Sequence, residues 1–315
     1  MRNLLGSSIS GASTRLWLTS MKYRYLLLRF LKPALRKSLT WHSGKVGAHL
    51  SQKELIWSGE WDALIILDAC RYDAFSEVIR EFLDGELKPV LSPASTTMGW
   101  LKEVWETKAW RNVIYVSATP MISKRGALKG FDAGSKFLDV IEVWDRGWDE
   151  NLATVPPSNV NLAVKTALAK LRLRGLKYPR DYKLVVHYIQ PHAPYITLQH
   201  VVRAIGSNEA LRNEVIDINL RRVGKPAGKF SIDYLLIGFL KNMLRSSKDV
   251  RTVIREAYLE NLRWVLRHVT KLVTRLEGRV IITADHGELL GEYGLYFHPD
   301  LPLPELRIVP WFAVR

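Results

Sequence analysis

The chain has 315 residues, 47% of them hydrophobic, and a formal net charge of +15. This length suits one large α/β domain or two small ones, and the hydrophobic content excludes a mainly disordered chain. The single cysteine, Cys70, excludes an internal disulfide, so nothing in the sequence requires an oxidising compartment. The positive charge favours anionic partners: phosphorylated or sulfated substrates, acidic lipid surfaces or nucleic acid.

Residues 1–56 form a basic segment with no acidic residue before Glu54. Its most apolar stretch is broken by Arg29, Lys32 and Pro33, so no transmembrane helix is expected. Residues 17–35 mix apolar and cationic side chains as an amphipathic helix does, which suits a peripheral contact with a membrane surface. A solvated helix packed on the body and an organelle targeting peptide without a cleavage signal are the alternatives. We expect a cytoplasmic protein that can attach to the inner face of the membrane.

The remaining residues, 57–315, alternate between strand and helix patterns and are expected to form one catalytic domain. Short apolar runs of strand length occur at residues 62–69, 112–118, 183–190, 279–284 and 308–314. Helical periodicity occurs between them, at residues 71–83, 161–174 and 252–278. This alternation predicts an α/β fold with a mostly parallel central sheet and helices on both faces.

One region, residues 196–250, interrupts this alternation with many cations and with glycine and proline residues. We interpret it as a partly helical insertion or lid over the site, or as a solvated excursion without a role.

Polar residues follow three of the expected strands, at Asp68, at "QPHAPY" (residues 190–195) and at "DHGE" (residues 285–288). Ligands of parallel sheets bind outside the carboxyl ends of the strands, so these residues should meet at one edge. A carboxylate and a neutral imidazole, as in Asp285 and His286, suit a divalent cation, and Gly287 lets the backbone turn close to it. A hydrogen-bonded turn at Asp285 and a helix cap at Asp68 are the alternatives.

Four segments resemble, in the correct order, motifs of the alkaline phosphatase superfamily, in particular its sulfatase-like branch. They are "LIILDACRYDAF", "SPASTTMGWL", "HYIQPHAPY" and "VIITADHGELLGEYG", which continues to the last strand. The resemblance implies an alkaline phosphatase-like domain that binds a divalent metal ion through Asp68, Thr97, Asp285 and His286. No second carboxylate and histidine motif is evident, so one ion is expected, and Zn, Mn, Ca and Mg are not distinguished.

The same resemblance implies that Thr97 is the nucleophile, with Thr96 and Ser95 as alternatives, although this segment also suits a polar loop or helix cap. A bound cation would lower the pKa of such a hydroxyl. Cys70 lacks the sequence context in which sulfatases form formylglycine, and we interpret it as a packing residue.

Two histidines and one arginine complete the predicted site. The resemblance implies that His192 and His298 face the substrate oxyanion or protonate the leaving group. Arg71 could contact a phosphate, or pair with Asp73 or Asp68. His187 lies within an expected strand and suits either a ligand or a core histidine.

The predicted function is metal-dependent hydrolysis of phosphate mono- or diesters with a threonine nucleophile, acting on an anionic ester substrate. The alternatives are a sulfatase, a phosphotransferase that moves a head group onto a lipid or glycan, and a catalytically silent binding protein. Nucleic acid is not an expected partner, because no recognition motif accompanies the positive charge.

Overall fold

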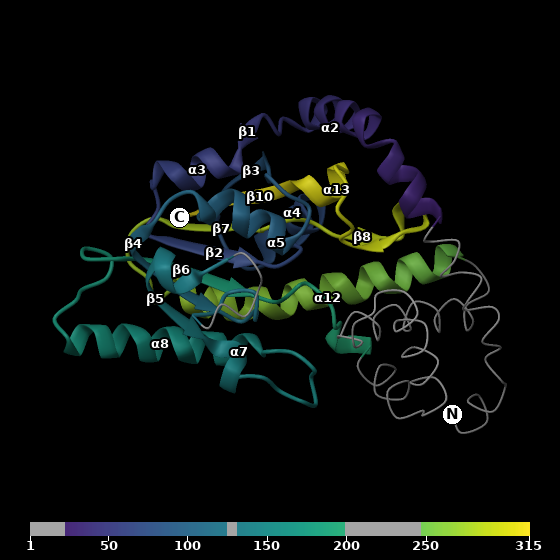
Figure 1. The fold of residues 1–315 in the computed structure, drawn as a ribbon. Helices are drawn as coiled ribbons and strands as arrows, with labels where there is room; N and C mark the ends of the chain where they lie inside the picture. The colour runs from purple at the N-terminus through teal and green to yellow at the C-terminus, as the bar shows by residue number, and fades with distance from the viewer. Residues whose placement is uncertain (1–22, 125–130, 199–246) are drawn as a thin grey trace, which may run out of the picture.

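The structure, a computed structural model, describes residues 23–124, 131–198 and 247–315 (Figure 1). Its centre is an eight-stranded sheet of order β1-β3-β10-β7-β2-β6-β4-β5. The strands are β1 (Leu50–Ser51), β2 (Ala63–Leu67), β3 (Gly85–Leu91), β4 (Trp110–Ser117), β5 (Phe137–Glu142), β6 (Lys183–Tyr188), β7 (Val280–Thr283) and β10 (Ile308–Val314). Among these strands only β10 runs antiparallel to its neighbours. The predicted α/β fold with a mostly parallel sheet is confirmed.

The central strand β2 reads "ALIIL", and all five side chains are buried. A strand in the middle of a parallel sheet is covered on both faces, so every position is apolar and no alternation is seen. β2 pairs with β6 on one side and with β7 on the other, and Ile66 lies opposite both His187 and Thr283. The carboxyl ends of β2 and β7 are therefore level at the same edge of the sheet.

Helices cover both faces of this sheet. α8 (Pro157–Leu173) and α12 (Ser247–Val273) pack against each other on one face, and α3 (Gln52–Ser58) lies on the other (Figure 1). The shorter helices are α4 (Tyr72–Val78), α5 (Thr97–Leu101), α6 (Ala133–Lys136), α7 (Val143–Arg146), α13 (Pro304–Arg307), the 3-10 turns η1 (Ile79–Glu81), η3 (Ile196–Leu198) and η4 (Glu292–Gly294), and the π-helical turn η2 (Lys102–Glu106). A small hairpin of β8 (Leu289–Leu290) and β9 (Tyr296–Phe297) follows β7.

The helix predicted at residues 252–278 is already present at Ser247, where the described range begins, and ends at Val273, before the expected cap at Gly278. Gly278 has another reason to be glycine. Its φ is +81°, and a Cβ there would collide with the carboxylate of Asp62. Gly278 lies against Asp62, the residue just before β2, and this close approach leaves no room for a side chain.

The basic N-terminal segment is described from residue 23. Residues 23–30 are helical, and after a break at Leu31 the chain continues as α2 (Lys32–Val46). β1 then pairs with β3, and α3 packs on the sheet, so the body takes in residues from Leu50 onwards, before the predicted start at residue 57. Residues 1–22, and residues 199–246 of the predicted insertion, lie outside the described residues. No helix in the described ranges has the length and apolar character to cross a membrane.

Candidate metal centre

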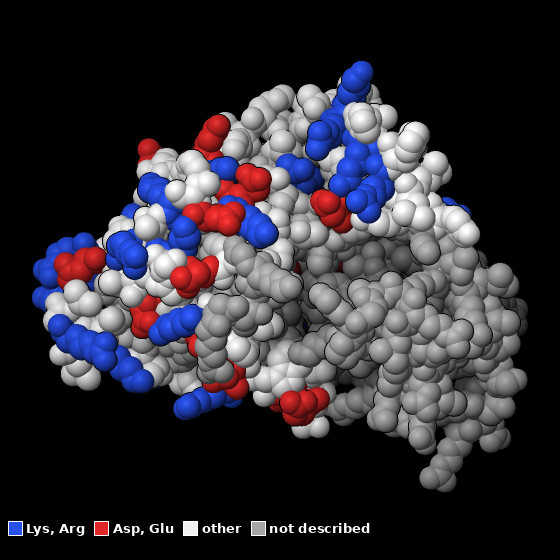
Figure 2. Space-filling model, viewed as in Figure 1, with Lys and Arg blue, Asp and Glu red and all other residues white. Residues whose placement is uncertain are grey.

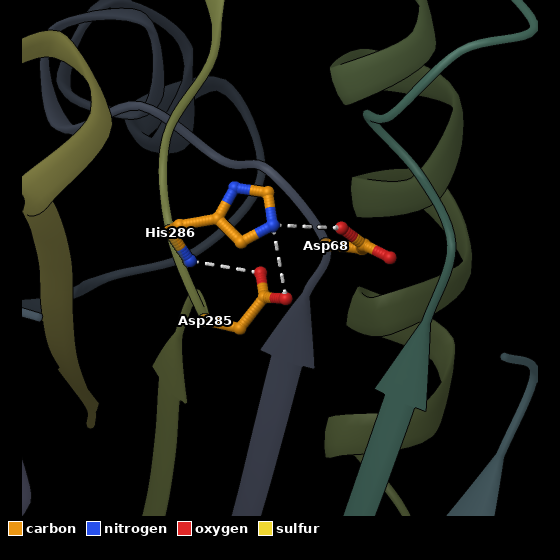
Figure 3. A group of neighbouring side chains, drawn as sticks. All are labelled: Asp68, Asp285 and His286. Atoms are coloured by element: carbon orange, nitrogen blue, oxygen red, sulfur yellow. Dashed lines mark hydrogen bonds and ion pairs between the residues drawn. The ribbon is translucent and has the colours of Figure 1, made fainter. Parts of the chain in front are cut away.

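Two neighbouring strands bring the predicted ligands together. Asp68 follows β2 directly, while Asp285 and His286 follow β7 after one alanine. Because β2 and β7 pair in register, these side chains meet at the carboxyl edge of the sheet (Figure 3). All three residues are buried.

Three potential ligand atoms of this group lie within 4.8 Å of one another. Nε2 of His286 lies 3.3 Å from a carboxylate oxygen of Asp285 and 3.7 Å from one of Asp68 (Figure 3). Nδ1 of His286 lies 2.8 Å from the carbonyl oxygen of Gly287, to which its N–H donates, so Nε2 presents a lone pair.

The hydrogen-bond acceptors of this group outnumber the donors that reach them. Asp68 Oδ1 and Asp285 Oδ2 are buried, with no hydrogen-bond partner among the described residues. The Thr97 hydroxyl, 3.2 Å from Nε2 of His286, brings one proton for three acceptors. Buried acceptors in this arrangement repel one another unless a cation or a proton lies between them, and two carboxylates with an imidazole form a ligand set that divalent metals accept. The residues present therefore fit a divalent cation.

The electrostatics of Asp68 point the same way. Burial raises the pKa of this carboxyl group well above its ordinary value, and the negative charges of Asp285 and Glu288 raise it further. A hydrogen bond from Thr97 acts in the opposite direction. The site therefore disfavours the ionised carboxylate that a bound cation would stabilise.

The backbone around Asp285 is fixed by several contacts. The side-chain Oδ1 of Asp285 accepts hydrogen bonds from the backbone N–H groups of Ala69, at 3.0 Å, and His286, at 2.8 Å. The Ser92 hydroxyl donates to the carbonyl oxygen of Asp285 at 2.5 Å. Gly287 has no room for a side chain, since a Cβ would collide with the carbonyl oxygen of Glu305. This glycine allows the close backbone approach that its place after the ligand pair suggested.

Thr97 is the first residue of α5, and the structure brings its hydroxyl to the ligand group. Thr96 is the N-cap of that helix and accepts a hydrogen bond from the backbone N–H of Gly99 at 3.2 Å. Ser95 Oγ lies 3.5 Å from Asp300. Of the three hydroxyl groups considered for the nucleophile, Thr97 therefore has the geometry that suits this role.

The two predicted site histidines contact each other beside the ligand group. Nε2 of His192 lies 2.9 Å from Nε2 of His298, and the His298 ring stacks on His286 with 4.4 Å between centroids. Nδ1 of His192 lies 2.5 Å from the carbonyl oxygen of Ala193, so its N–H donates there and its Nε2 accepts from His298. Burial lowers the pKa of His192 to about 4 and that of His298 well below its usual value. Both rings are therefore neutral at pH 7.

Arg71 contacts acidic residues beside the ligand group and none of the three predicted ligands of that group. Its guanidinium group donates to both carboxylate oxygens of Asp73, at 2.9 and 2.7 Å, and to Glu292 at 2.7 Å and the carbonyl oxygen of Glu288 at 3.2 Å. These contacts engage each of its three nitrogens, and the side chain is buried. The arrangement matches the ion pair considered from the sequence and does not match the contact with a substrate phosphate.

Sequence reasoning missed two residues of α12 that hold the loops of the site. The Tyr258 hydroxyl donates to the carbonyl oxygen of Ala69 at 2.7 Å and accepts from the backbone N–H of Arg71 at 2.9 Å. The Asn261 amide donates to the carbonyl oxygens of three residues around His192, at 3.1 to 3.3 Å, and its Oδ1 accepts from the N–H of Ile196 at 2.8 Å. A polar Asn261 on the apolar stripe of the predicted helix was the available signal.

Gln52 is a third residue that was missed. It is fully buried, and its amide donates to Thr283 at 2.8 Å and to the carbonyl oxygen of Ala284 at 2.6 Å. Its amide oxygen, Oε1, accepts a hydrogen bond from the Trp100 indole N–H at 2.8 Å. Gln52 thus connects the end of β7 to α5, and lay within the segment that the sequence assigned to the N-terminal region.

No family model matches the sequence, and no match was found among curated proteins. Similar solved structures include the soluble domain of lipooligosaccharide phosphoethanolamine transferase A from Neisseria meningitidis, at 14% identity and a TM-score of 0.45, covering 80% of this chain and 75% of that one. A protein in the alkaline phosphatase superfamily from Vibrio parahaemolyticus is 9% identical, with a TM-score of 0.43 and coverage of 81% and 60%. One of these similar structures is thus a member of the superfamily whose motifs the sequence resembles. At such identities the likeness concerns the fold.

A third similar structure is the C-terminal periplasmic domain of phosphoethanolamine transferase EptC from Campylobacter jejuni, at 12% identity and a TM-score of 0.38, covering 80% of this chain and 77% of that one. The expected cytoplasmic location is wrong by this comparison, since the similar domain is periplasmic. The expectation rested partly on the single cysteine, which excludes an internal disulfide but does not exclude an oxidising compartment.

Proposed function

We propose that this chain is a metal-dependent enzyme that breaks phosphate ester bonds through the hydroxyl group of Thr97. The observation that carries the proposal is the group of buried acceptors formed by Asp68, Asp285 and His286, with Thr97 Oγ1 lying 3.2 Å from Nε2 of His286. These four residues would hold one divalent cation, whose charge lowers the pKa of the hydroxyl group and offsets the charge of the phosphoryl group.

In this proposal the Thr97 hydroxyl loses its proton to solvent, and Oγ1 forms the new bond to phosphorus while the bond between phosphorus and the ester oxygen breaks. The departing oxygen takes up a proton, and an acceptor oxygen then displaces Thr97 from phosphorus. His192 and His298 are neutral when no anion is near, and the Nε2 proton of His298 is donated to His192. A phosphoryl oxygen would replace His192 as the acceptor of this hydrogen bond. A phosphate dianion beside these rings would raise their pKa and let them protonate the leaving oxygen.

Hydrolysis and transfer differ only in whether water or an alcohol supplies the acceptor oxygen. Transfer onto a lipid or glycan alcohol is the second candidate. It is favoured by the exposed helix of residues 23–46, which carries apolar and cationic side chains and suits contact with a membrane surface.

A sulfatase reading has less support. Formylglycine in sulfatases derives from a cysteine or serine, and the chain's cysteine, Cys70, is fully buried in the turn after β2. Its thiol donates to the backbone oxygen of Arg71 at 3.9 Å, and the hydroxyl that meets the ligand group belongs to Thr97.

A screen of divalent metals against aryl phosphate, aryl phosphodiester and aryl sulfate tests the proposal, with Thr97→Ala as the matched inactive variant. We expect phosphate esters to react faster than the sulfate ester, and acid-quenched wild-type protein to carry phosphate on the peptide that contains Thr97. Addition of glycerol as an acceptor separates transfer from hydrolysis by the product formed. Faster reaction of the aryl sulfate, or equal rates in the Thr97→Ala variant, would contradict the proposal.

A further inference from the structure

The helical segment of residues 23–46, which is interrupted at Leu31, has two apolar faces. Its inward face packs on the body, because Tyr25, Leu28 and Leu35 contact the cluster of Leu289, Leu295, Leu301, Leu303 and Leu306. Its other apolar face is turned to solvent. Tyr23, Leu26, Leu27 and Phe30 follow one another at helical spacing, and Phe30 is 84% exposed and Leu27 60% exposed. A helix that needed one apolar face to pack on the body would carry polar residues on the other.

Cations flank this exposed face. Residues 23–46 contain six of them and no acidic residue: Arg24, Arg29, Lys32, Arg36, Lys37 and Lys45. Figure 2 shows Lys and Arg side chains gathered over α2 at the top of the view. Lys32 pairs with Asp300 at 2.9 Å, and Lys45 lies 3.8 Å from the centre of the exposed Trp41 ring. Arg24 donates to the carbonyl oxygen of Tyr293 at 3.4 Å, whereas Arg29, Arg36 and Lys37 are exposed, as are Leu27 and Phe30. Exposed cations and exposed apolar side chains on one segment fit the boundary between lipid headgroups and acyl chains.

We propose that the face formed by Tyr23, Leu26, Leu27 and Phe30, with its flanking cations, lies on an anionic lipid bilayer. Nucleic acid would explain the cations but not the aliphatic side chains, because phosphate contacts require charge and base contacts require stacking or hydrogen bonding. An anionic bilayer explains both. This inference goes beyond the proposed function and does not depend on it.

The orientation that follows concerns the candidate metal centre. The inward face of the same helix packs on residues 289–306, the segment that carries His298. A bilayer against the outward face would therefore lie one helix thickness from this segment. Such a position suits an ester or an acceptor alcohol in the headgroup region of a lipid.

Co-sedimentation of the full chain with vesicles tests the surface. Vesicles of phosphatidylcholine alone are compared with vesicles of equal parts phosphatidylcholine and phosphatidylglycerol, at low and high salt. We expect binding to the anionic vesicles only, weakened by salt. Leu27→Ser with Phe30→Ser should weaken it by roughly tenfold or more, because these side chains would enter the acyl boundary. Arg29→Gln with Arg36→Gln should weaken it by roughly fivefold per cation.

The matched control is Leu162→Ser with Leu173→Ser, two exposed leucines of α8. This variant should bind vesicles as the wild type does. Turnover of a soluble aryl ester should be unchanged in the Leu27→Ser, Phe30→Ser variant. An inactive wild type would count against the proposed function alone, since vesicle binding is measured separately.

A site-specific label gives a second measurement that does not depend on removing the apolar face. Cys70 is buried, so Phe30→Cys and Leu173→Cys can each be labelled with a polarity-sensitive fluorophore in the folded protein. The label at residue 30 should shift to the blue on anionic vesicles, and the label at residue 173 should not. Equal shifts at both positions, equal binding to both vesicle types, or binding to RNA with none to vesicles would overturn the proposal.

Discussion

Tyr258 and Asn261 lie one turn apart on the same face of α12, and each holds a different loop of the candidate metal centre. Tyr258 bonds the turn after Asp68, and Asn261 bonds the loop around His192. Both side chains are fully buried. A single rigid helix thus sets the distance between a predicted metal ligand and a predicted acid–base histidine.

Tyr258→Phe tests this positioning role. The change leaves the carbonyl oxygen of Ala69 and the N–H of Arg71 without their partner, so we expect a free energy of unfolding lower by about 1–3 kcal/mol. Turnover of the aryl phosphate should fall by about tenfold or more, because small displacements of a ligand are costly to the reaction. Thermal unfolding and steady-state kinetics measure the two effects.

The matched control is Tyr188→Phe, which removes a buried hydroxyl bonded to Asn161 at 2.5 Å. Its stability should fall by a comparable amount while turnover stays within about twofold of the wild type. If both tyrosine variants lose turnover in proportion to stability, Tyr258 supports the fold in general and has no special role at the site.

Asp68→Asn should have opposite effects on the metal-free and metal-loaded protein. Burial and the charges of Asp285 and Glu288 disfavour the Asp68 carboxylate, so the neutral amide should raise the melting temperature of chelator-treated protein. The same change removes a ligand and should abolish the rise in melting temperature that added divalent metal produces. Differential scanning calorimetry with and without metal measures both. A metal-induced rise of wild-type size in this variant would exclude Asp68 as a ligand.

The neighbouring threonines should separate chemistry from helix capping. Thr97→Ala should reduce turnover by roughly a thousandfold or more, while metal binding, followed by calorimetric titration, persists through Asp68, Asp285 and His286. Thr96→Ala removes the N-cap of α5 and should cost about 0.5–2 kcal/mol of stability with a smaller loss of turnover. Ser95→Ala serves as the neutral control. The reverse order of the two threonine variants in turnover would assign the nucleophile to Thr96.

The sequence was sufficient to predict the mostly parallel character of the sheet, five of its eight strands, and the meeting of Asp68 with Asp285. Buried parallel strands are continuous apolar runs, and a carboxylate at the end of such a run can only lie at the carboxyl edge of the sheet. β3, "GELKPVL", was not predicted, because its charged and proline residues suit a loop better than a strand. Its backbone is nevertheless paired with β10 along its whole length, and this tertiary contact outweighs its local preference.

The supporting residues of the site were harder to predict for a different reason. Gln52 and Thr283 bond each other across 231 residues of sequence, and no local pattern reports such a contact. The sequence left two roles open for Arg71, a phosphate contact and an ion pair. One of its ion-pair partners, Glu292, lies between β8 and β9, more than 200 residues away in the chain. Ligands on strand ends follow from local sequence, whereas the side chains that orient them come from distant segments.

His187 should make the protein sensitive to acid without any part in the chemistry. It is fully buried in β6, its Nδ1 lies 2.8 Å from the Tyr115 hydroxyl, and its ring meets Trp100 edge-on at 6.2 Å. Burial lowers the pKa of His187 from 6.5 to about 4. The unfolded chain therefore binds a proton at a higher pH than the folded one. Stability is retained above about pH 6.5 and lost as the pH falls toward 4, by about 3 kcal/mol for this one group.

His187→Leu combined with Tyr115→Phe removes both partners of the hydrogen bond and leaves an apolar core, so stability at pH 8 should change little. Between pH 6.5 and 4.5 the free energy of unfolding of this variant should fall less steeply than that of the wild type, by about 1 kcal/mol per pH unit. Urea unfolding at a series of pH values measures the slope. His192 and His298 keep their own contributions in both proteins, so the difference between the two slopes isolates His187. Parallel slopes would mean that His187 is protonated to the same extent in the folded and unfolded states.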